Sequence, residues 1–246
     1  MNLKNLSFIL LFSPTIFFAQ NPNPSPEVDA FILDEMDYEN LPGMSTLIVK
    51  EGEIVWVESY GMADIENSIP VSDNTAFLMA SVSKLFTGTA LMQLFEDGQI
   101  DLDDDINNYL PFSVSSPNYP DNSITFRMLM THTSSISDNW SAIDNYYSMG
   151  DPTISLADCM EGYFSTSGVD YDPQNNFNND IPGSAFDYSN MATDLAGYLV
   201  EIISQELFSE YSNTEVFDAL CMENTSWYLS DFDTLNVARP YDWQGG

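Results

Sequence analysis

The spacing of apolar residues predicts that the chain opens with a helix and continues into a β-hairpin. Apolar side chains recur at helical intervals over residues 28–36, and Pro42-Gly43 ends the pattern. Two β-rich runs, 45–49 and 54–59, then flank Glu51-Gly52-Glu53, which is typical of an antiparallel hairpin. A simple repeat of alternating parallel strands and helices is therefore excluded.

The rest of the chain is predicted to be mainly helical. Apolar spacing indicates a helix over 84–96, which Gly98 can end in the left-handed conformation. Residues 165–183 are rich in Asn, Gly and Pro and read as a loop, and helical spacing returns over 191–208. We expect a helical lobe from about residue 102 to residue 232.

Composition narrows the class of protein and its partners. The 246 residues are 44% apolar and 13% aromatic, which is enough for one globular domain with room for two lobes. The chain holds 38 acidic residues against five basic ones, a formal charge of −33. Such a field repels polyanions, so nucleic acid and anionic membrane surfaces are expected to be poor partners, and no nucleic-acid partner is predicted.

The N-terminus has the pattern of an export signal. A short polar start with Lys4 precedes an apolar run from Leu6 to Phe18, so residues 1–20 read as a secretory signal peptide. The run is too short for a membrane span. Residues 21–27 alternate Pro with polar residues and read as a linker to a domain over 28–246. The mature protein is expected to be secreted or periplasmic, with no membrane span.

The two cysteines leave two interpretations open. Cys159 and Cys221 could form a disulfide in an oxidising compartment, or remain two separate thiols. Neither has the spacing of a metal ligand. No motif in the chain calls for a metal or another cofactor, and the oligomeric state is not readable from the sequence.

Candidate chemistry begins at Ser81-Val82-Ser83-Lys84. On a helix, positions three apart share a face, so the Ser81 hydroxyl and the Lys84 amine are predicted to be neighbours. A serine hydroxyl becomes a good nucleophile when a nearby base takes its proton. The start of a helix also supplies free N–H groups and positive dipole. Taken alone, however, this motif is common in unrelated chains.

Four ordered segments make the signal specific, and with them the chain resembles the penicillin-recognising serine hydrolases. The similarity is greatest to the class C β-lactamase-like and D-alanyl-D-alanine carboxypeptidase-like branch. The segments that carry it are residues 77–84 with the Ser-x-x-Lys, 94–104 with Leu102-Asp103-Asp104, 124–135 with Thr131-His132-Thr133, and 182–190 with Tyr188-Ser189-Asn190. Residues 220–225 also resemble that branch, with Cys221 where its members have Gly.

The resemblance implies a fold and a set of roles. The fold would be α/β (α+β) of the β-lactamase/transpeptidase type, an antiparallel sheet flanked by helices plus a mainly helical lobe. Ser81 would be the acylated nucleophile, Lys84 its proton acceptor, Tyr188 a proton relay and Asn190 a substrate-binding residue. The substrate would be a small molecule or peptide: a β-lactam, a D-alanyl peptide or an ester. No metal or cofactor is implied.

One family motif has no counterpart here. Members of the family carry a third motif, with Lys or His before Thr or Ser and Gly, on a strand well beyond Tyr-x-Asn, and no Lys follows Lys84 and no His follows His132. We therefore expect the C-terminal sheet strands to be missing and the chain to be an inactive fragment of a longer enzyme. The alternative is a non-catalytic binding or interaction protein that keeps the β-lactamase-like fold.

Other candidate residues have structural interpretations. The single histidine, His132, lies in a segment that the family places away from the chemistry, so we expect it to bond loop backbone. The acidic run 101–105 fails as a calcium loop, since Ile106 stands at the required Gly position. Trp140, Tyr146 and Tyr147 either line a cleft or, as we favour, pack.

Overall fold

The computed structural model describes residues 21–148 and 150–242 and divides the chain into two compact units. One unit contains the residues up to Phe77 together with those from Leu235 onward, and the other runs from Leu78 to Thr234. The predicted signal peptide, 1–20, lies outside the described residues. Within the described part, no helix is both long and apolar enough to cross a membrane.

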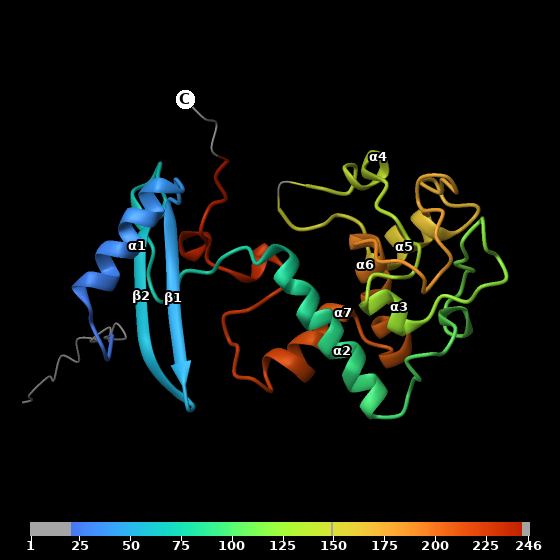
Figure 1. Ribbon diagram of the computed structural model, residues 1–246, viewed down its shortest axis with the longest axis horizontal. Helices are drawn as coiled ribbons and strands as arrows, with labels where there is room; N and C mark the ends of the chain where they lie inside the picture. Colours follow the sequence, from blue (N-terminus) through green and yellow to red (C-terminus); the bar gives the residue numbers. More distant parts are fainter. Residues whose placement is uncertain (1–20, 149, 243–246) are drawn as a thin grey trace, which may run out of the picture. The chain divides into compact units, whose positions relative to one another are not determined.

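The first unit is a helix followed by a small antiparallel sheet (Figure 1). Helix α1 spans Pro26–Tyr38, and strands β1 (Gly43–Lys50), β2 (Glu53–Asp64) and β3 (Ile69–Pro70) pair in the order β1-β2-β3. The predicted hairpin is confirmed, because Lys50 pairs with Glu53 across the two-residue turn Glu51-Gly52. Both turn residues have positive φ, 55° and 82°, as a tight hairpin turn of this hand requires.

The predicted linker, 21–27, is part of this unit. Asn21 is buried and its amide donates to Glu58, and the Asn23 amide donates to the backbone oxygen of Val55 on β2. Helix α1 also begins at Pro26 and not at Val28, because the Ser25 hydroxyl accepts the Val28 N–H and caps it. Hydrogen bonds of two side-chain amides and a helix N-cap therefore fix residues 21–27, although their composition predicts a linker.

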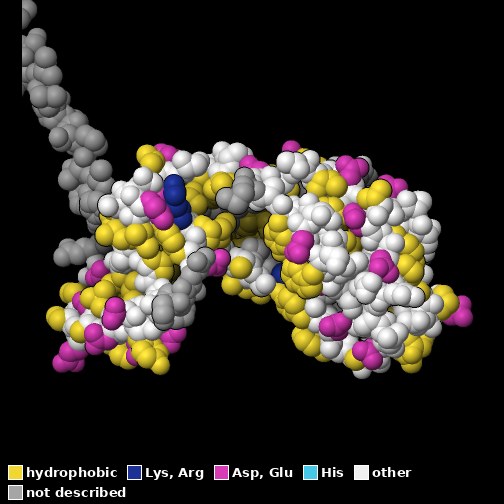
Figure 2. Space-filling model, turned by 90° about the horizontal axis from the view of Figure 1, so that it is seen from above, with side chains coloured by type: hydrophobic (Ala, Val, Ile, Leu, Met, Phe, Trp, Pro, Cys, Tyr) yellow, Lys and Arg dark blue, Asp and Glu magenta, His cyan; other side chains and the backbone are white. Residues whose placement is uncertain are grey.

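Strand β1 leaves much apolar surface in contact with solvent. Among the described residues, its sequence Gly43–Lys50 pairs only with β2. The side chains of Leu47, Ile48 and Val49 are 60%, 54% and 55% exposed, so both faces of the strand present apolar groups. Charged side chains on the surface are mainly acidic: in Figure 2 Asp and Glu side chains are spread over the visible face with few Lys or Arg between them.

The second unit is predominantly helical, as predicted, with a core of its own. Helix α6 is at its centre and contacts α2, α3, α5 and α7. The helices of four or more residues are η1 (Ala80–Ser83), α2 (Lys84–Glu96), α3 (Phe126–Met130), α4 (Trp140–Ile143), α5 (Leu156–Phe164), α6 (Asn190–Ser204), α7 (Phe208–Ser212) and η3 (Asn213–Phe217). Leu91, Phe126 and Leu195 are among the fully buried side chains. The unit starts at Leu78 and not near residue 102, so α2 belongs to it.

The ends of the two long helices follow from local backbone conformation. Helix α2 covers the predicted residues 84–96, and Gly98, with φ 70°, closes it through hydrogen bonds to the last turn. The prediction of a helix to residue 208 was too long. Gln205 turns into the left-handed conformation at φ 63° and ends α6 at Ser204, and α7 starts afresh.

The cysteines are separate thiols, which decides between the two interpretations left open by the sequence. Cys159 is half-buried and Cys221 is exposed, and neither is in a disulfide. Burial raises the pKa of Cys159 to about 12, so this thiol is protonated at neutral pH. Cys221 has φ 55°, a conformation that favours glycine, which accounts for the Gly at this position in the family resemblance.

Candidate active site

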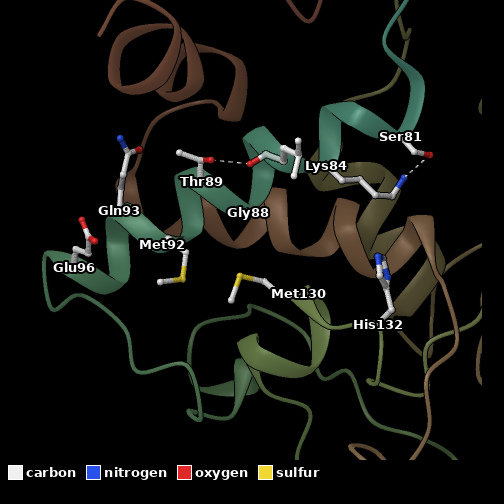
Figure 3. Close-up of a pocket in the computed structure, with 10 residues that line it drawn as sticks. Ser81, Lys84, Gly88, Thr89, Met92, Gln93, Glu96, Met130 and His132 are labelled. Atoms are coloured by element: carbon white, nitrogen blue, oxygen red, sulfur yellow. Dashed lines mark hydrogen bonds between the residues drawn. The ribbon is translucent and has the colours of Figure 1, made fainter. Parts of the chain in front are cut away.

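Ser81 and Lys84 lie where a short 3-10 turn passes into helix α2. Ser81 is in η1 and Lys84 is the first residue of α2, so the two side chains project from consecutive turns. Lys84 Nζ donates to Ser81 Oγ across 3.4 Å (Figure 3). The preceding residue, Ala80, has φ 43°, a strained conformation for a residue with a side chain. The backbone therefore turns sharply just before an exposed serine hydroxyl.

Tyr188 reaches the same hydroxyl from a distant part of the sequence. Its phenol donates to Ser81 Oγ across 2.8 Å, and Lys84 Nζ lies 5.0 Å from the centre of its ring. The pKa of Tyr188 is below its usual range, mainly because Lys84 hydrogen-bonds the phenol and then because Ser81 does. Once deprotonated, the phenolate accepts hydrogen bonds from both groups and is stabilised by them, so this tyrosine gives up its proton more readily than an isolated one.

Asn190 completes the group of four residues predicted from the motifs. It is the first residue of α6, and its Oδ1 accepts a hydrogen bond of 2.7 Å from Lys84 Nζ. The structure thus brings Ser81, Lys84, Tyr188 and Asn190 together within the helical unit. Helices α2 and α6 pack against each other, which holds the two halves of the group in register.

Asp138 also belongs to this group, and the sequence analysis missed it. One of its oxygens accepts from the backbone N–H of Asn190 and from Nδ2 of the same residue, at 3.0 and 2.7 Å. The other accepts from the Ser189 hydroxyl at 3.0 Å and from the Met191 N–H at 3.1 Å. No periodic pattern or motif marks Asp138, because it lies in an irregular segment between α3 and α4.

His132 lies at the site, which corrects the expectation that it is away from the chemistry. Its ring centre is 4.5 Å from that of Tyr188. Its Nδ1 accepts the backbone N–H of Ser189 across 3.3 Å, so the expected bond to loop backbone is present as well. Burial and then the charge of Lys84 lower the pKa of His132, against the opposing effect of Asp138. The ring is therefore neutral at pH 7 and acts as an acceptor.

A cavity of about 630 Å³ extends from Ser81 and Lys84 along one side of α2 (Figure 3). Its walls combine the apolar side chains of Leu85, Met92 and Met130 with polar and charged ones. The lining residues away from the nucleophile are Leu85, Gly88, Thr89, Met92, Gln93, Glu96, Met130 and His132. The volume is that of a small-molecule site, and the apolar lining suits an uncharged part of a substrate.

The remaining candidates do not contribute to this cavity. Trp140 and Tyr147 are 50% and 69% exposed, and the Tyr146 hydroxyl bonds Asp170. In the acidic run, Asp103 forms a paired hydrogen bond with Arg127 at 2.7 and 2.9 Å. Within the described ranges, no cluster of His, Cys, Asp and Glu side chains is arranged to hold a metal ion.

Comparison with known proteins gives the family of the chain. Residues 28–246 match the Beta-lactamase family model. A protein named flp from Staphylococcus aureus (strain NCTC 8325 / PS 47) is 26% identical over 219 residues, 89% of this chain and 41% of that protein. The chain therefore spans less than half the length of this curated relative.

Solved structures show the same fold at low identity. The hydrolase EstCE1, described as having promiscuous acyltransferase activity, superposes with a TM-score of 0.71 at 24% identity, covering 86% of this chain and 54% of that one. A class C beta-lactamase superposes with a TM-score of 0.69 at 23% identity, covering 89% and 55%. With the family model matching most of its length, the chain belongs to the Beta-lactamase family and has the β-lactamase/transpeptidase-like α+β fold.

Proposed function

We propose that the protein is a serine hydrolase in which Ser81 is acylated by a substrate carbonyl. The proposal rests on two contacts to one oxygen: Ser81 Oγ accepts hydrogen bonds from the Tyr188 hydroxyl at 2.8 Å and from Lys84 Nζ at 3.4 Å. Two titratable groups within reach of a serine hydroxyl are what nucleophilic catalysis requires. A purely structural pair would not need the hydroxyl to be exposed.

In the proposed first step, Ser81 Oγ attacks the substrate carbonyl carbon and forms an ester. The hydroxyl proton passes to the Lys84 amine or to the Tyr188 phenolate, and then to the leaving nitrogen or oxygen as the scissile bond breaks. The lowered pKa of Tyr188 supports this route, since it makes the phenolate accessible. Water then hydrolyses the ester and regenerates the Ser81 hydroxyl.

The proposed substrates are β-lactams, D-alanyl peptides and small esters. All three present an acyl carbonyl to Ser81, and the apolar part of each can lie against the apolar side chains of the cavity along α2. The acidic surface repels the carboxylate that β-lactams and D-alanyl peptides carry, so among the three classes the charge favours small neutral esters. Asn190 is proposed to contact the substrate acyl side chain as well as Lys84, because its side chain stands between α2 and the start of α6.

The test is covalent labelling of the protein produced from its natural gene. A fluorescent penicillin and a fluorescent activated ester are each applied to the wild-type protein, and peptide mass spectrometry locates the label. We expect label on Ser81 from at least one probe, and none on the Ser81→Ala variant. A wild-type protein that binds the probes reversibly without forming an ester would favour the non-catalytic binding protein and overturn the proposal.

A further inference from the structure

Asn190 has an amide whose two ends face opposite partners. Its Oδ1 accepts from Lys84 Nζ at 2.7 Å, and its Nδ2 donates to Asp138 Oδ2 at 2.7 Å. Rotating the amide by half a turn would place the NH₂ group against the Lys84 amine, donor against donor. It would also place the amide oxygen against the Asp138 carboxylate, acceptor against acceptor. Only one orientation satisfies both neighbours.

Asp138 is fixed more firmly than the amide it contacts. Besides Asn190 Nδ2, its carboxylate accepts the backbone N–H groups of Asn190 and Met191 and the hydroxyl of Ser189, at 3.0, 3.1 and 3.0 Å. These donors are at the N-terminal end of α6, a 15-residue helix, where a negative charge is stabilised. The carboxylate is half-buried, so solvent competes weakly for it.

We infer that Asp138 is a positioning residue for the reaction, acting through Asn190. It sets the amide so that an oxygen faces Lys84, and the oxygen in turn holds Nζ beside Ser81. The inference rests on the proposed acylation of Ser81. Within the described residues, the hydrogen bonds of Asp138 go to residues 189–191, and the one to the Asn190 amide is the link that leads to Lys84. Its charge also acts on Tyr188, as the smallest cause of that pKa shift.

The alternative is that Asp138 only caps α6 through its backbone contacts. The two roles differ in what happens when the Asn190 side chain is removed. If Asp138 acts through the amide, its replacement matters only while the amide is present. If it only caps the helix, its replacement has the same effect with or without the amide.

The experiment is a double-mutant cycle on the rate constant of Ser81 acylation, with Asp138→Asn and Asn190→Ala. Asp138→Asn is expected to lower the acylation rate constant about 100-fold, the scale of a misplaced catalytic group. Probe affinity before acylation is expected to stay within about threefold, since Asp138 lies outside the cavity wall. In the Asn190→Ala background, Asp138→Asn is expected to change the rate constant less than about threefold.

A matched control and a second variant keep the outcomes distinct. Asp187 is a half-buried carboxylate in the segment between α5 and α6 that accepts hydrogen bonds from the side chains of Ser137 and Asn178, and Asp187→Asn should leave the rate constant unchanged. The double variant Asp138→Asn with Asn190→Asp exchanges the two side chains and so keeps one amide and one carboxylate at the pair. Its Ser81 should be acylated at least tenfold faster than that of the Asp138→Asn single variant. If Asp138→Asn does not fold, Asn190→Ala is the reference variant.

The positioning role would be overturned if Asp138→Asn lowered the acylation rate constant equally in the wild-type and Asn190→Ala backgrounds. It would also be overturned if the double variant with the exchanged side chains were acylated no faster than its reference variant. A wild-type protein that is not acylated at all would instead overturn the proposed function, and the Asp138 inference with it.

Discussion

The Tyr188 hydroxyl donates to Ser81 Oγ across 2.8 Å, although 107 positions separate the two residues. The contact joins the turn before α2 to the segment before α6, so any change that separates these helices also separates the phenol from the serine. Four expected outcomes test this arrangement and the scaffold around it.

Replacing Tyr188 by Phe removes the hydroxyl and keeps the ring. We expect the acylation rate constant of Ser81 to fall about 100-fold or more, the scale of a lost acid–base group. The ring packing against His132 should survive, so thermal stability should change little. The measurement is the rate of probe labelling beside a melting curve. Tyr147→Phe, at a 69% exposed tyrosine of the same unit, is the matched control and should label at the wild-type rate.

Replacing Lys84 by Gln should raise the pKa of Tyr188. In the wild-type protein this pKa lies below 10, with Lys84 as the largest cause. The chain holds 13 tyrosines, so the absorbance of tyrosinate is titrated as a difference against a Tyr188→Phe variant in each background. If the pKa of Tyr188 were the same in the wild-type protein and in the Lys84→Gln variant, Lys84 would not be the cause of its lowered pKa.

His132 should make the protein less stable in mild acid. Its folded-state pKa is lowered below 6.5 by burial and by Lys84, with Asp138 opposing and Tyr188 packed on the ring. Between that pKa and 6.5 the unfolded chain binds the proton and the folded chain does not. Stability is therefore complete above pH 6.5 and declines as the pH falls through that window.

The 246-residue chain holds one histidine, so its imidazole signal can be followed in a sample of this chain without an affinity tag. Proton NMR of the imidazole gives the folded-state pKa directly. Urea unfolding at several pH values should show a steeper loss for wild type than for His132→Gln. If the unfolding free energy depended on pH in the same way in wild type and in His132→Gln, the histidine would not contribute to the acid sensitivity.

Two glycines of the α2 region should respond oppositely to the same substitution. Gly98 has φ 70°, so Gly98→Ala places a side chain in the left-handed conformation and should cost about 1 kcal/mol of unfolding free energy. Gly88 lies inside α2 with no atom within 4 Å of an added Cβ, and Gly88→Ala should gain about 0.5 to 1 kcal/mol. Chemical denaturation of the wild-type protein and the two variants gives the change in unfolding free energy for each substitution, which should be negative for Gly98→Ala and positive for Gly88→Ala.

The parts of the fold with a regular repeat were predictable from the sequence. The hairpin around Glu51-Gly52 follows from two β-rich runs on either side of a turn, and helix α2 follows from the helical spacing of its apolar residues. The end of α6 was not, because a single left-handed residue, Gln205, stops it inside an unbroken apolar pattern. A local conformation of that kind has no signature in the spacing of side chains.

The site was predictable only as far as its motifs extend. Ser81 and Lys84 are neighbours because a helical turn makes them so, and Tyr188 came from the resemblance. His132 and Asp138 come from the irregular segment after α3, where positive φ values at His132 and Ser135, 54° and 65°, redirect the chain. Which side chains such a segment brings to α6 depends on tertiary packing, and no periodic pattern encodes it.

Strand β1 has a consequence for handling the protein in solution. In the part of the chain that the structure describes, β1 is an edge strand, with unpaired backbone groups and with the apolar side chains of Leu47, Ile48 and Val49 exposed to solvent. The formal charge of −33 opposes the approach of identical molecules, and added electrolyte shortens the reach of that repulsion. The protein should therefore stay monodisperse at low ionic strength, whereas high salt concentrations should promote its aggregation, which light scattering measures.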